Sequence, residues 1–331
     1  MAQAMDRFDC VVVGGGPSGA IAAEDLARAG RSVALLDKAG RIKPCGGAIP
    51  PRLIRDFDIP DALIVARITS AHIVSPKEQV ADMPVERGYV GMVDREHFDE
   101  FLRDRAASAG AERRAGTYLR IERDAEGHPV VVYDGRLSPD FYSWIFPHGP
   151  TTSIGTGSAH KGFSLRGAVG ALRDRTGLAE ARTIRREGAP IPLKPLRTWD
   201  NGRDILLAGD AAGVVAPASG EGIYYAMLGG RLAAEAVAEA LATGDARALA
   251  AARKRFMKDH GQVFWILGIM QTFWYRNDWT RERFVKMCRD PDVQRLTWES
   301  YMNKKLVRRD PLAHVKIFFK DLAHLMGIAR A

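Results

Sequence analysis

The sequence predicts an α/β protein: a parallel sheet covered by helices, a smaller antiparallel region and a helical C-terminal cap. Three observations predict this fold. Residues 9–37 have the pattern of a strand, a glycine-rich turn, a helix and a second strand, which is a parallel βαβ unit. A strand, a turn and a long helix recur at residues 204–241, and residues 243–331 have helical character. A chain of 331 residues can bury a large core in two structural regions.

The first glycine-rich turn carries a dinucleotide fingerprint. Gly14, Gly16 and Gly19 have G-x-G-x-x-G spacing directly after the apolar residues 11–13. The first glycine permits the tight turn, the second lets the backbone approach a pyrophosphate, and the third lets the helix pack close to the strand. Asp37, at the end of the second strand, can accept from a ribose hydroxyl. The pattern predicts a Rossmann-type dinucleotide-binding domain and leaves NAD and FAD open.

A second nucleotide signature lies far downstream. Residues 205–207 have the pattern of another buried strand, and Asp210 follows it closely. Gly220 and Gly222 then precede a helix expected at residues 223–241. Asp210 could bind a sugar-alcohol hydroxyl. The positive end of the helix could face an anionic ring, such as that of a reduced flavin.

With both signatures on one chain, the sequence resembles FAD-dependent oxidoreductases of the glutathione-reductase-like, hydroxylase-type class. The resemblance implies that residues of the two signatures contact the pyrophosphate, adenosine ribose, ribityl chain and flavin ring of FAD. These residues are Gly14, Gly16, Gly19, Asp37, Asp210, Gly220 and Gly222. Arg95 resembles the family arginine that approaches the flavin's linker or pyrophosphate, with a surface arginine as the alternative. Only one complete fingerprint is present, so NADPH is expected to dock transiently on the same domain.

Two further motifs resemble those of geranylgeranyl reductases. They are KPCGGAIPP at residues 43–51 and YSWIFPHG at residues 142–149, and the resemblance extends over residues 9–328. The bacteriochlorophyll/chlorophyll branch is the most similar. The resemblance implies FAD-dependent hydrogenation of isolated double bonds of a geranylgeranyl chain to give phytyl. The substrate would be the geranylgeranylated pigment or geranylgeranyl diphosphate. NADPH would be the electron donor, with a ferredoxin as the alternative.

An isolated prenyl double bond requires an apolar pocket that excludes water. Tyr142, Trp144 and Phe146 alternate along a predicted strand, so they face one side and could line such a pocket. A plain sheet core is the alternative. Gly46 and Gly47 lack side chains, so their loop can approach a flavin closely.

Two residues are candidates for delivering the proton that accompanies hydride transfer. By the family resemblance, Cys45 lies near the isoalloxazine ring and could gate the pocket or relay a proton. A buried structural cysteine is the alternative. Tyr142 is the second candidate. The other cysteines, Cys10 and Cys288, are too few and too dispersed for a disulfide framework or a zinc site, so we expect no metal and a reducing, cytoplasmic compartment.

The distribution of charged and apolar residues indicates which kinds of partner the protein could bind. The net charge of +8 favours anionic surfaces, but the basic residues are scattered and no nucleic-acid motif is present. No apolar segment is long enough to span a bilayer. The uncharged residues 263–275 suit a buried helix or a helix at a membrane surface. After Asp310-Pro311, an apolar stripe recurs at helical spacing, at Leu312, Val315, Phe319, Leu322 and Met326.

This stripe predicts peripheral association with the cytoplasmic face of a photosynthetic membrane. Packing of the same helix on the protein's own core stays open. The chain reaches its first strand within about ten residues, which leaves no room for a signal peptide. The sequence does not specify an oligomeric state.

The sequence departs from the family after the predicted strand at residues 129–133. The family usually carries about sixty further residues there, including a G-A-D-G-x-x-S motif. Here residues 134–139 follow directly. The missing part would add a strand to the parallel sheet. Because the remaining FAD motifs are intact, we still expect FAD binding, whereas FAD affinity, NADPH access and full activity stay open.

These patterns give three predicted regions. The Rossmann-type FAD-binding layer comprises residues 6–40, 94–133 and 203–241, the substrate region residues 41–93 and 135–193, and the helical C-terminal region residues 243–331. Alternative functions are a flavin monooxygenase or halogenase of the same fold, or an archaeal-type lipid reductase. The remaining alternative is a degenerate protein that binds prenyl chains or pigments without catalysis.

Overall fold

The computed structural model describes residues 6–38, 43–75, 77–116, 120–123, 129–132, 144–148, 150–155, 162, 164–175, 177–274 and 278–304. The chain divides into two compact units. Unit 1 comprises Met1–Gly47, Asp94–Ala216 and Gly220–Asp259, and unit 2 comprises Ala48–Val93, Pro217–Ser219 and His260–Ala331. All the predicted site residues belong to unit 1. The roles assigned above to the three sequence regions remain predictions.

Five elements form the Rossmann-like layer of unit 1: β1 (Cys10–Val13), α1 (Pro17–Arg28), β2 (Val33–Asp37), α3 (Arg95–Ser108) and β8 (Glu112–Ala115). The three strands are parallel and lie in the order β1-β2-β8. Parallel neighbours need a crossover connection, which α1 supplies between β1 and β2. The predicted α/β fold is confirmed.

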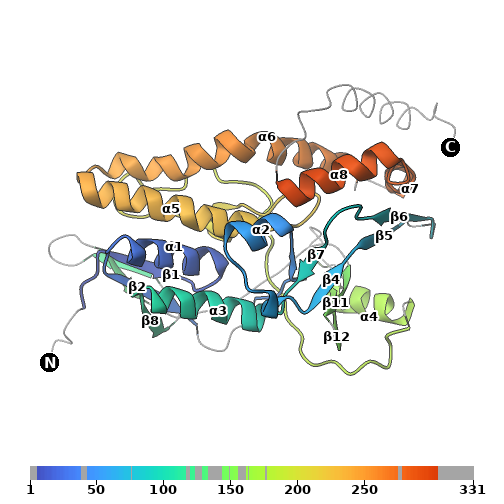
Figure 1. Cartoon of the computed structure of the whole chain (residues 1–331), viewed down its shortest axis with the longest axis horizontal. Helices are drawn as coiled ribbons and strands as arrows, with labels where there is room; N and C mark the ends of the chain where they lie inside the picture. Colours follow the sequence, from blue (N-terminus) through green and yellow to red (C-terminus); the bar gives the residue numbers. More distant parts are fainter. Residues whose placement is uncertain are drawn as a thin grey trace. The chain divides into compact units, whose positions relative to one another are not determined.

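Helix α5 (Ile223–Thr243) runs beside α1 and covers it (Figure 1). Small residues permit the close approach. Ala20 and Ala23 of α1 are fully buried, and Gly230 of α5 lies where a Cβ would stand 2.1 Å from the carbonyl oxygen of Ser18. The contact positions the first turn of α1, which follows the glycine-rich loop.

Two details of the predicted sheet are wrong. Residues 205–207 do not form a strand, because Leu206 makes only an isolated bridge with Asp200. Val11 and Val13 are 41% and 44% exposed, although β1 was expected to be buried. Both findings have one physical cause: among the described strands β1 pairs with β2 alone, so one edge of the sheet lacks a neighbour.

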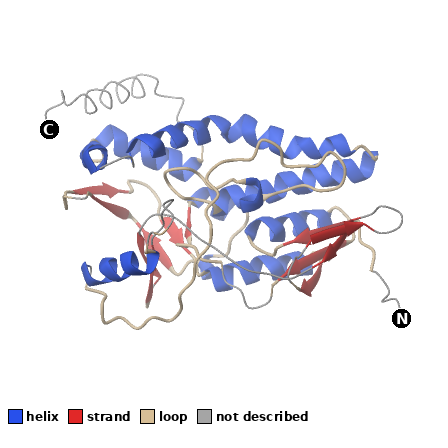
Figure 2. Cartoon of the chain, turned by 180° about the vertical axis from the view of Figure 1, so that it is seen from behind, coloured by secondary structure: helices blue, strands red, loops and turns tan. Residues whose placement is uncertain are grey.

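The remaining elements of unit 1 are two antiparallel pairs and shorter helices (Figure 2). They are β9 (Arg120–Arg123) with β10 (Pro129–Val132), β11 (Trp144–His148) with β12 (Thr151–Gly155), α4 (Leu165–Arg175), η2 (Gly209–Ala212) and η3 (Ala246–Ala250). Strand β11 contains Trp144 and Phe146 of the predicted pocket strand. Tyr142 lies outside the described residues.

Unit 2 contains small antiparallel sheets and helices. The sheets are β3 (Ala48–Ile49), β7 (Val90–Met92) and β4 (Ala66–Ile68) in that order, and β5 (Ser70–Val74) with β6 (Val80–Pro84). The helices are α2 (Pro51–Asp56), η1 (Asp61–Leu63), α7 (Asp278–Met287) and α8 (Pro291–Asn303). Side chains of β6 and α7 share a buried cluster that includes Met83 and Val285.

Helix α6 (Ala251–Trp274) begins in unit 1, and its residues from His260 onward belong to unit 2. Trp265, Ile269 and Phe273 recur every four residues and are all exposed, Trp265 by 67%. The uncharged segment is therefore not a fully buried helix. Within the described part of the chain, no helix has the length and apolar character needed to cross a bilayer. The predicted C-terminal stripe lies outside the described residues.

Candidate functional site

The glycine-rich loop has the geometry that the fingerprint predicts. The Gly14 N–H donates to the carbonyl of Leu36 at 2.7 Å, which ties the loop to β2. Gly14 has a φ of +98°, a conformation that glycine adopts without strain. At Gly19, a Cβ would stand 1.9 Å from the Gly14 carbonyl oxygen. The first and third glycines are therefore required by the turn and by the helix–strand contact.

The space in front of this loop fits the pyrophosphate of a dinucleotide. A Cβ at Gly14 or Gly16 would meet no described heavy atom within 4 Å. Gly16 is the N-cap of α1 and supplies no side-chain cap, so the first-turn amides are free to bind an anion. The Ser18 hydroxyl is buried in this turn and has no hydrogen-bond partner among the described residues. These donors suit phosphate oxygens.

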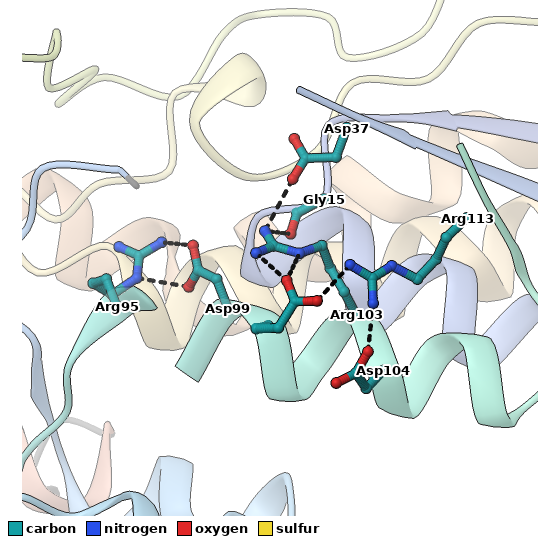
Figure 3. Close-up of polar contacts among 8 residues, drawn as sticks. Gly15, Asp37, Arg95, Asp99, Arg103, Asp104 and Arg113 are labelled. Atoms are coloured by element: carbon teal, nitrogen blue, oxygen red, sulfur yellow. Dashed lines mark hydrogen bonds and ion pairs between the residues drawn. The ribbon is translucent and has the colours of Figure 1, made fainter. Parts of the chain in front are cut away.

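Asp37 ends β2, as the ribose-binding role requires, and Arg103 holds it in place (Figure 3). Arg103 Nη1 donates to Asp37 Oδ2 at 2.9 Å and to the Gly15 carbonyl at 3.2 Å. Its other nitrogens donate to Glu100 at 2.9 and 2.6 Å. Arg103 therefore links α3 to both the fingerprint loop and the ribose acid. The sequence analysis did not identify it.

A cleft of about 350 Å³ opens at this end of the sheet. Asp37 and Ala115, at the carboxyl ends of β2 and β8, both line it. Ligands of parallel α/β sheets bind at that edge. Its cations outnumber its acids, which suits a phosphorylated nucleoside. The lining residues are Leu35, Asp37, Lys38, Glu100, Arg103, Arg113, Arg114 and Ala115.

Arg95 starts α3, and its side chain is buried, so the alternative of a surface arginine is wrong. Its Nε and Nη2 donate to the two carboxylate oxygens of Asp99, both at 2.7 Å (Figure 3). The Cys45 sulfur also acts electrostatically on the guanidinium. Burial opposes the charge on Arg95, but the attraction of Asp99 and Cys45 outweighs it and raises the pKa of the guanidinium. A contact of Arg95 with FAD remains a prediction.

The loop that carries Cys45 is tightly constrained. The Gly47 N–H donates to Cys45 Sγ at 3.4 Å, and Gly47 has a φ of +75°. A Cβ at Gly46 would stand 2.2 Å from two carbons of the Phe146 ring, so only glycine permits this contact. His148, two residues further along β11, is buried. Its side chain is 6% exposed and is hydrogen-bonded to the Gly46 carbonyl.

Asp210 lies in η2 and forms an ion pair with Lys43, at the start of the Cys45 loop. The second signature therefore comes next to the cysteine motif, 167 positions away in the sequence. Gly222 is the N-cap of α5 and supplies no side-chain cap, and Gly220 has a φ of +64°. An anionic ring facing this end of α5 remains a prediction.

The structure thus gathers the predicted residues into two groups within unit 1. One contains the fingerprint glycines with Asp37, and the other contains Cys45 with Gly46, Gly47, Phe146 and Arg95. The Trp144 side chain and all of Tyr142 lie outside what the structure describes. Five residues were missed by sequence reasoning: Lys43, Asp94, Asp99, Arg103 and His148. The Arg95–Asp99 contact could have been predicted from the sequence, because an acid lies four residues after an arginine on a predicted helix.

Comparisons with known proteins agree with this geometry. A family described as an NAD(P)-binding Rossmann-like domain matches residues 12–58. A solved structure of a geranylgeranyl bacteriochlorophyll reductase-like protein from Thermoplasma acidophilum superposes with a TM-score of 0.75, at 18% identity. The match covers 98% of this chain and 100% of that one. At that identity, the likeness establishes the fold.

Relatives found by sequence similarity indicate the family as well as the fold. A geranylgeranyl diphosphate reductase of Rhodobacter capsulatus is 52% identical over 385 residues, covering 97% of this chain and 98% of that protein. A chloroplastic geranylgeranyl diphosphate reductase of Oryza sativa is 32% identical, covering 97% of this chain and 86% of that protein. The first alignment is longer than the chain, so that relative contains residues without a counterpart here. The chain belongs to the geranylgeranyl diphosphate reductase family.

Proposed function

We propose that the protein is an FAD-dependent reductase that hydrogenates isolated double bonds of a geranylgeranyl chain, with NADPH as the electron donor. The chain would be attached to bacteriochlorophyll or to diphosphate. The observation that carries the proposal is that the open space at the fingerprint glycines and the tightly constrained Cys45 loop lie in the same unit. The names of the relatives in the family support the substrate class.

Different described residues would bind different parts of FAD. The α1 amides beyond Gly16 would hold the pyrophosphate, and Asp37, oriented by Arg103, the adenosine ribose. Asp210 would bind the ribityl chain, and the α5 N-terminus after Gly222 would face the flavin. Reduced FAD, when bound, supplies the hydride for the alkene.

Cys45 is the proton donor in this proposal. The S–H bond breaks, the proton goes to the alkene carbon that does not receive hydride, and the electron pair stays on sulfur. The Gly47 N–H donates to that sulfur and would stabilise the negative charge left there, and the positive charge of Arg95 would add to this stabilisation. Tyr142 remains the alternative donor.

Substitution Cys45→Ser tests this role. We expect kcat for alkene reduction to fall about a hundredfold or more, because a serine hydroxyl is a much weaker acid than a thiol. Reduction of the flavin by NADPH should be unchanged, since it precedes protonation. Stopped-flow absorbance separates the two half-reactions. Cys10→Ser, in β1, is the matched control and should keep full turnover. Full turnover by Cys45→Ser itself would exclude the thiol as the essential acid.

An anaerobic experiment tests the function as a whole. The purified protein is reconstituted with FAD, reduced with NADPH and mixed with geranylgeranyl-bacteriochlorophyll or geranylgeranyl diphosphate in lipid. We expect flavin reoxidation with one substrate and a product heavier by two hydrogens per reduced bond. Reoxidation without a mass gain, or a protein that takes up no FAD, would contradict the proposal.

One observation favours a second candidate, a protein that binds prenyl pigments without turnover. The β1 edge is unpaired among the described strands, and Val11 and Val13 are exposed there. A sheet shortened in this way could bind FAD too weakly for catalysis. Pigment binding without flavin retention would support this candidate over the reductase.

We further infer peripheral contact with the cytoplasmic face of a membrane, supported by the exposed aromatic side chains of α6. Trp265 and Phe273 lie two turns apart on an uncharged stretch, as in helices that insert into the headgroup region. The double substitution Trp265→Ser/Phe273→Ser should lower retention on anionic liposomes about thirtyfold or more, since each exposed aromatic contributes roughly 1 kcal/mol or more at the interface. Leu241→Ser, on α5, is the exposed apolar control. Equal sedimentation of both variants would exclude this face as the anchor.

A further inference from the structure

Two side chains on one face of β11 contact the Cys45 loop, both of them at Gly46. Phe146 and His148 are two positions apart on the strand, so their side chains point to the same side. The Phe146 ring lies directly against Gly46, where it would collide with any Cβ. The His148 Nε2–H donates to the Gly46 carbonyl at 3.0 Å. The peptide next to Cys45 is thus held by a ring contact and by a hydrogen bond.

The second ring nitrogen of His148 is also engaged. Nδ1 lies 2.7 Å from Asp94 Oδ1. Because a carbonyl oxygen only accepts, Nε2 carries a hydrogen, and Nδ1 faces the Asp94 carboxylate. The ring is 6% exposed, whereas the Asp94 side chain is 37% exposed and keeps contact with solvent. Both polar atoms of a buried ring are therefore satisfied, which fixes its orientation.

Asp94 connects this hydrogen bond back to the cysteine. It is the N-cap of α3, and the next residue is Arg95. Asp94 contacts His148, and His148 donates to the carbonyl of Gly46, the residue after Cys45. The Cys45 loop is therefore tied to the start of α3.

We propose that His148 is a positioning residue, which with Asp94 fixes the Cys45 loop and so holds the Cys45 thiol in place beside the start of α3. The consequence for alkene protonation rests on the proposed function, but the positioning itself does not. His148 touches no reacting atom in this scheme. It acts through the Gly46 carbonyl.

Alkylation of Cys45 by iodoacetamide tests the positioning without FAD or substrate. His148→Ala removes the donor to Gly46, and we expect the loop to open more often and alkylation to accelerate about tenfold, the factor expected for a lost charge-assisted hydrogen bond. His148→Gln keeps an N–H donor at the same reach and should restore the slow rate. Asp94→Asn removes the negative charge that faces His148 Nδ1, and it should give an intermediate alkylation rate.

Three controls test whether the measured alkylation comes from Cys45 alone. Burial raises the pKa of the Cys10 thiol to about 11, and Cys288 is buried, so both should stay unlabelled in the folded protein. Cys45→Ser should remove the fast label. His72→Ala breaks another histidine–aspartate pair, His72 with Asp82, which is exposed and belongs to unit 2. It should leave the Cys45 rate unchanged.

In the reconstituted enzyme, His148→Ala should lower kcat about tenfold with little change in KM or in flavin reduction by NADPH, and His148→Gln should recover most of the loss. Equal alkylation rates in His148→Ala and the wild type would overturn the proposal, as would failure of glutamine to rescue either readout. If His148→Ala does not fold, Asp94→Asn and His148→Gln decide the question by the same rates. If the wild type reduces no geranylgeranyl substrate, the proposed function fails while the alkylation rates still test the positioning.

Discussion

Gly16→Ala is expected to leave the apoprotein folded and to abolish FAD binding. Gly16 has a φ of −71° and a ψ of 178°, an extended conformation that alanine adopts freely. A Cβ there would meet no described atom within 4 Å. The folded protein therefore accommodates the methyl group, but the methyl group then occupies the space through which the backbone approaches the pyrophosphate. Loss of that approach should weaken FAD binding about a hundredfold or more.

Two measurements on the same sample separate these effects. The melting temperature of the apoprotein should match that of the wild type, while flavin absorbance after reconstitution and desalting should be lost. Gly268→Ala is the matched control, because Gly268 also has no described neighbour at its Cβ position but lies in α6. It should retain FAD. A Gly16→Ala protein that stays yellow would show that the pyrophosphate does not lie against this loop.

The fingerprint could be predicted from sequence because its constraints are local. Gly14, Gly16 and Gly19 act within one turn, and apolar residues on either side are enough to predict the flanking strands. The strand expected at residues 205–207 depends instead on a neighbour. With β1 unpaired on that side, the segment has no strand partner among the described residues, and Leu206 makes only an isolated bridge. Strand formation is a property of the sheet more than of the segment.

The supporting residues of the site were missed for a related reason. Arg103 contacts Asp37 across 66 positions of the sequence, and His148 contacts Gly46 across 102. No local spacing encodes such pairs. The alternation along β11 could have placed His148 on the face of Phe146, because both lie in the YSWIFPH motif. What that face touches became visible only with the fold.

Gly230→Ala should destabilise the protein by about 3 kcal/mol or more, the upper end of the range for overpacking. Alanine favours a helix over glycine by about 1 kcal/mol, so local propensity alone predicts a gain. The Cβ, however, would stand 2.1 Å from the carbonyl oxygen of Ser18 and 2.9 Å from its carbon. Both are backbone atoms of α1, and they cannot move away without shifting the whole helix. The α1–α5 contact must therefore open.

The adjacent residue provides the control for this prediction. A Cβ at Gly229 would lie 3.5 Å from the Gly209 nitrogen and 3.9 Å from Val214, which are ordinary contacts. Gly229→Ala should therefore be neutral or stabilising, and urea unfolding of the two apoproteins gives the difference directly. Because Ser18 lies in the first turn of α1, a helix displaced by Gly230→Ala should also bind FAD more weakly than Gly229→Ala does. Equal stability of the two variants would mean that α1 and α5 do not approach this closely, and the placement of the pyrophosphate cradle would then have to be reconsidered.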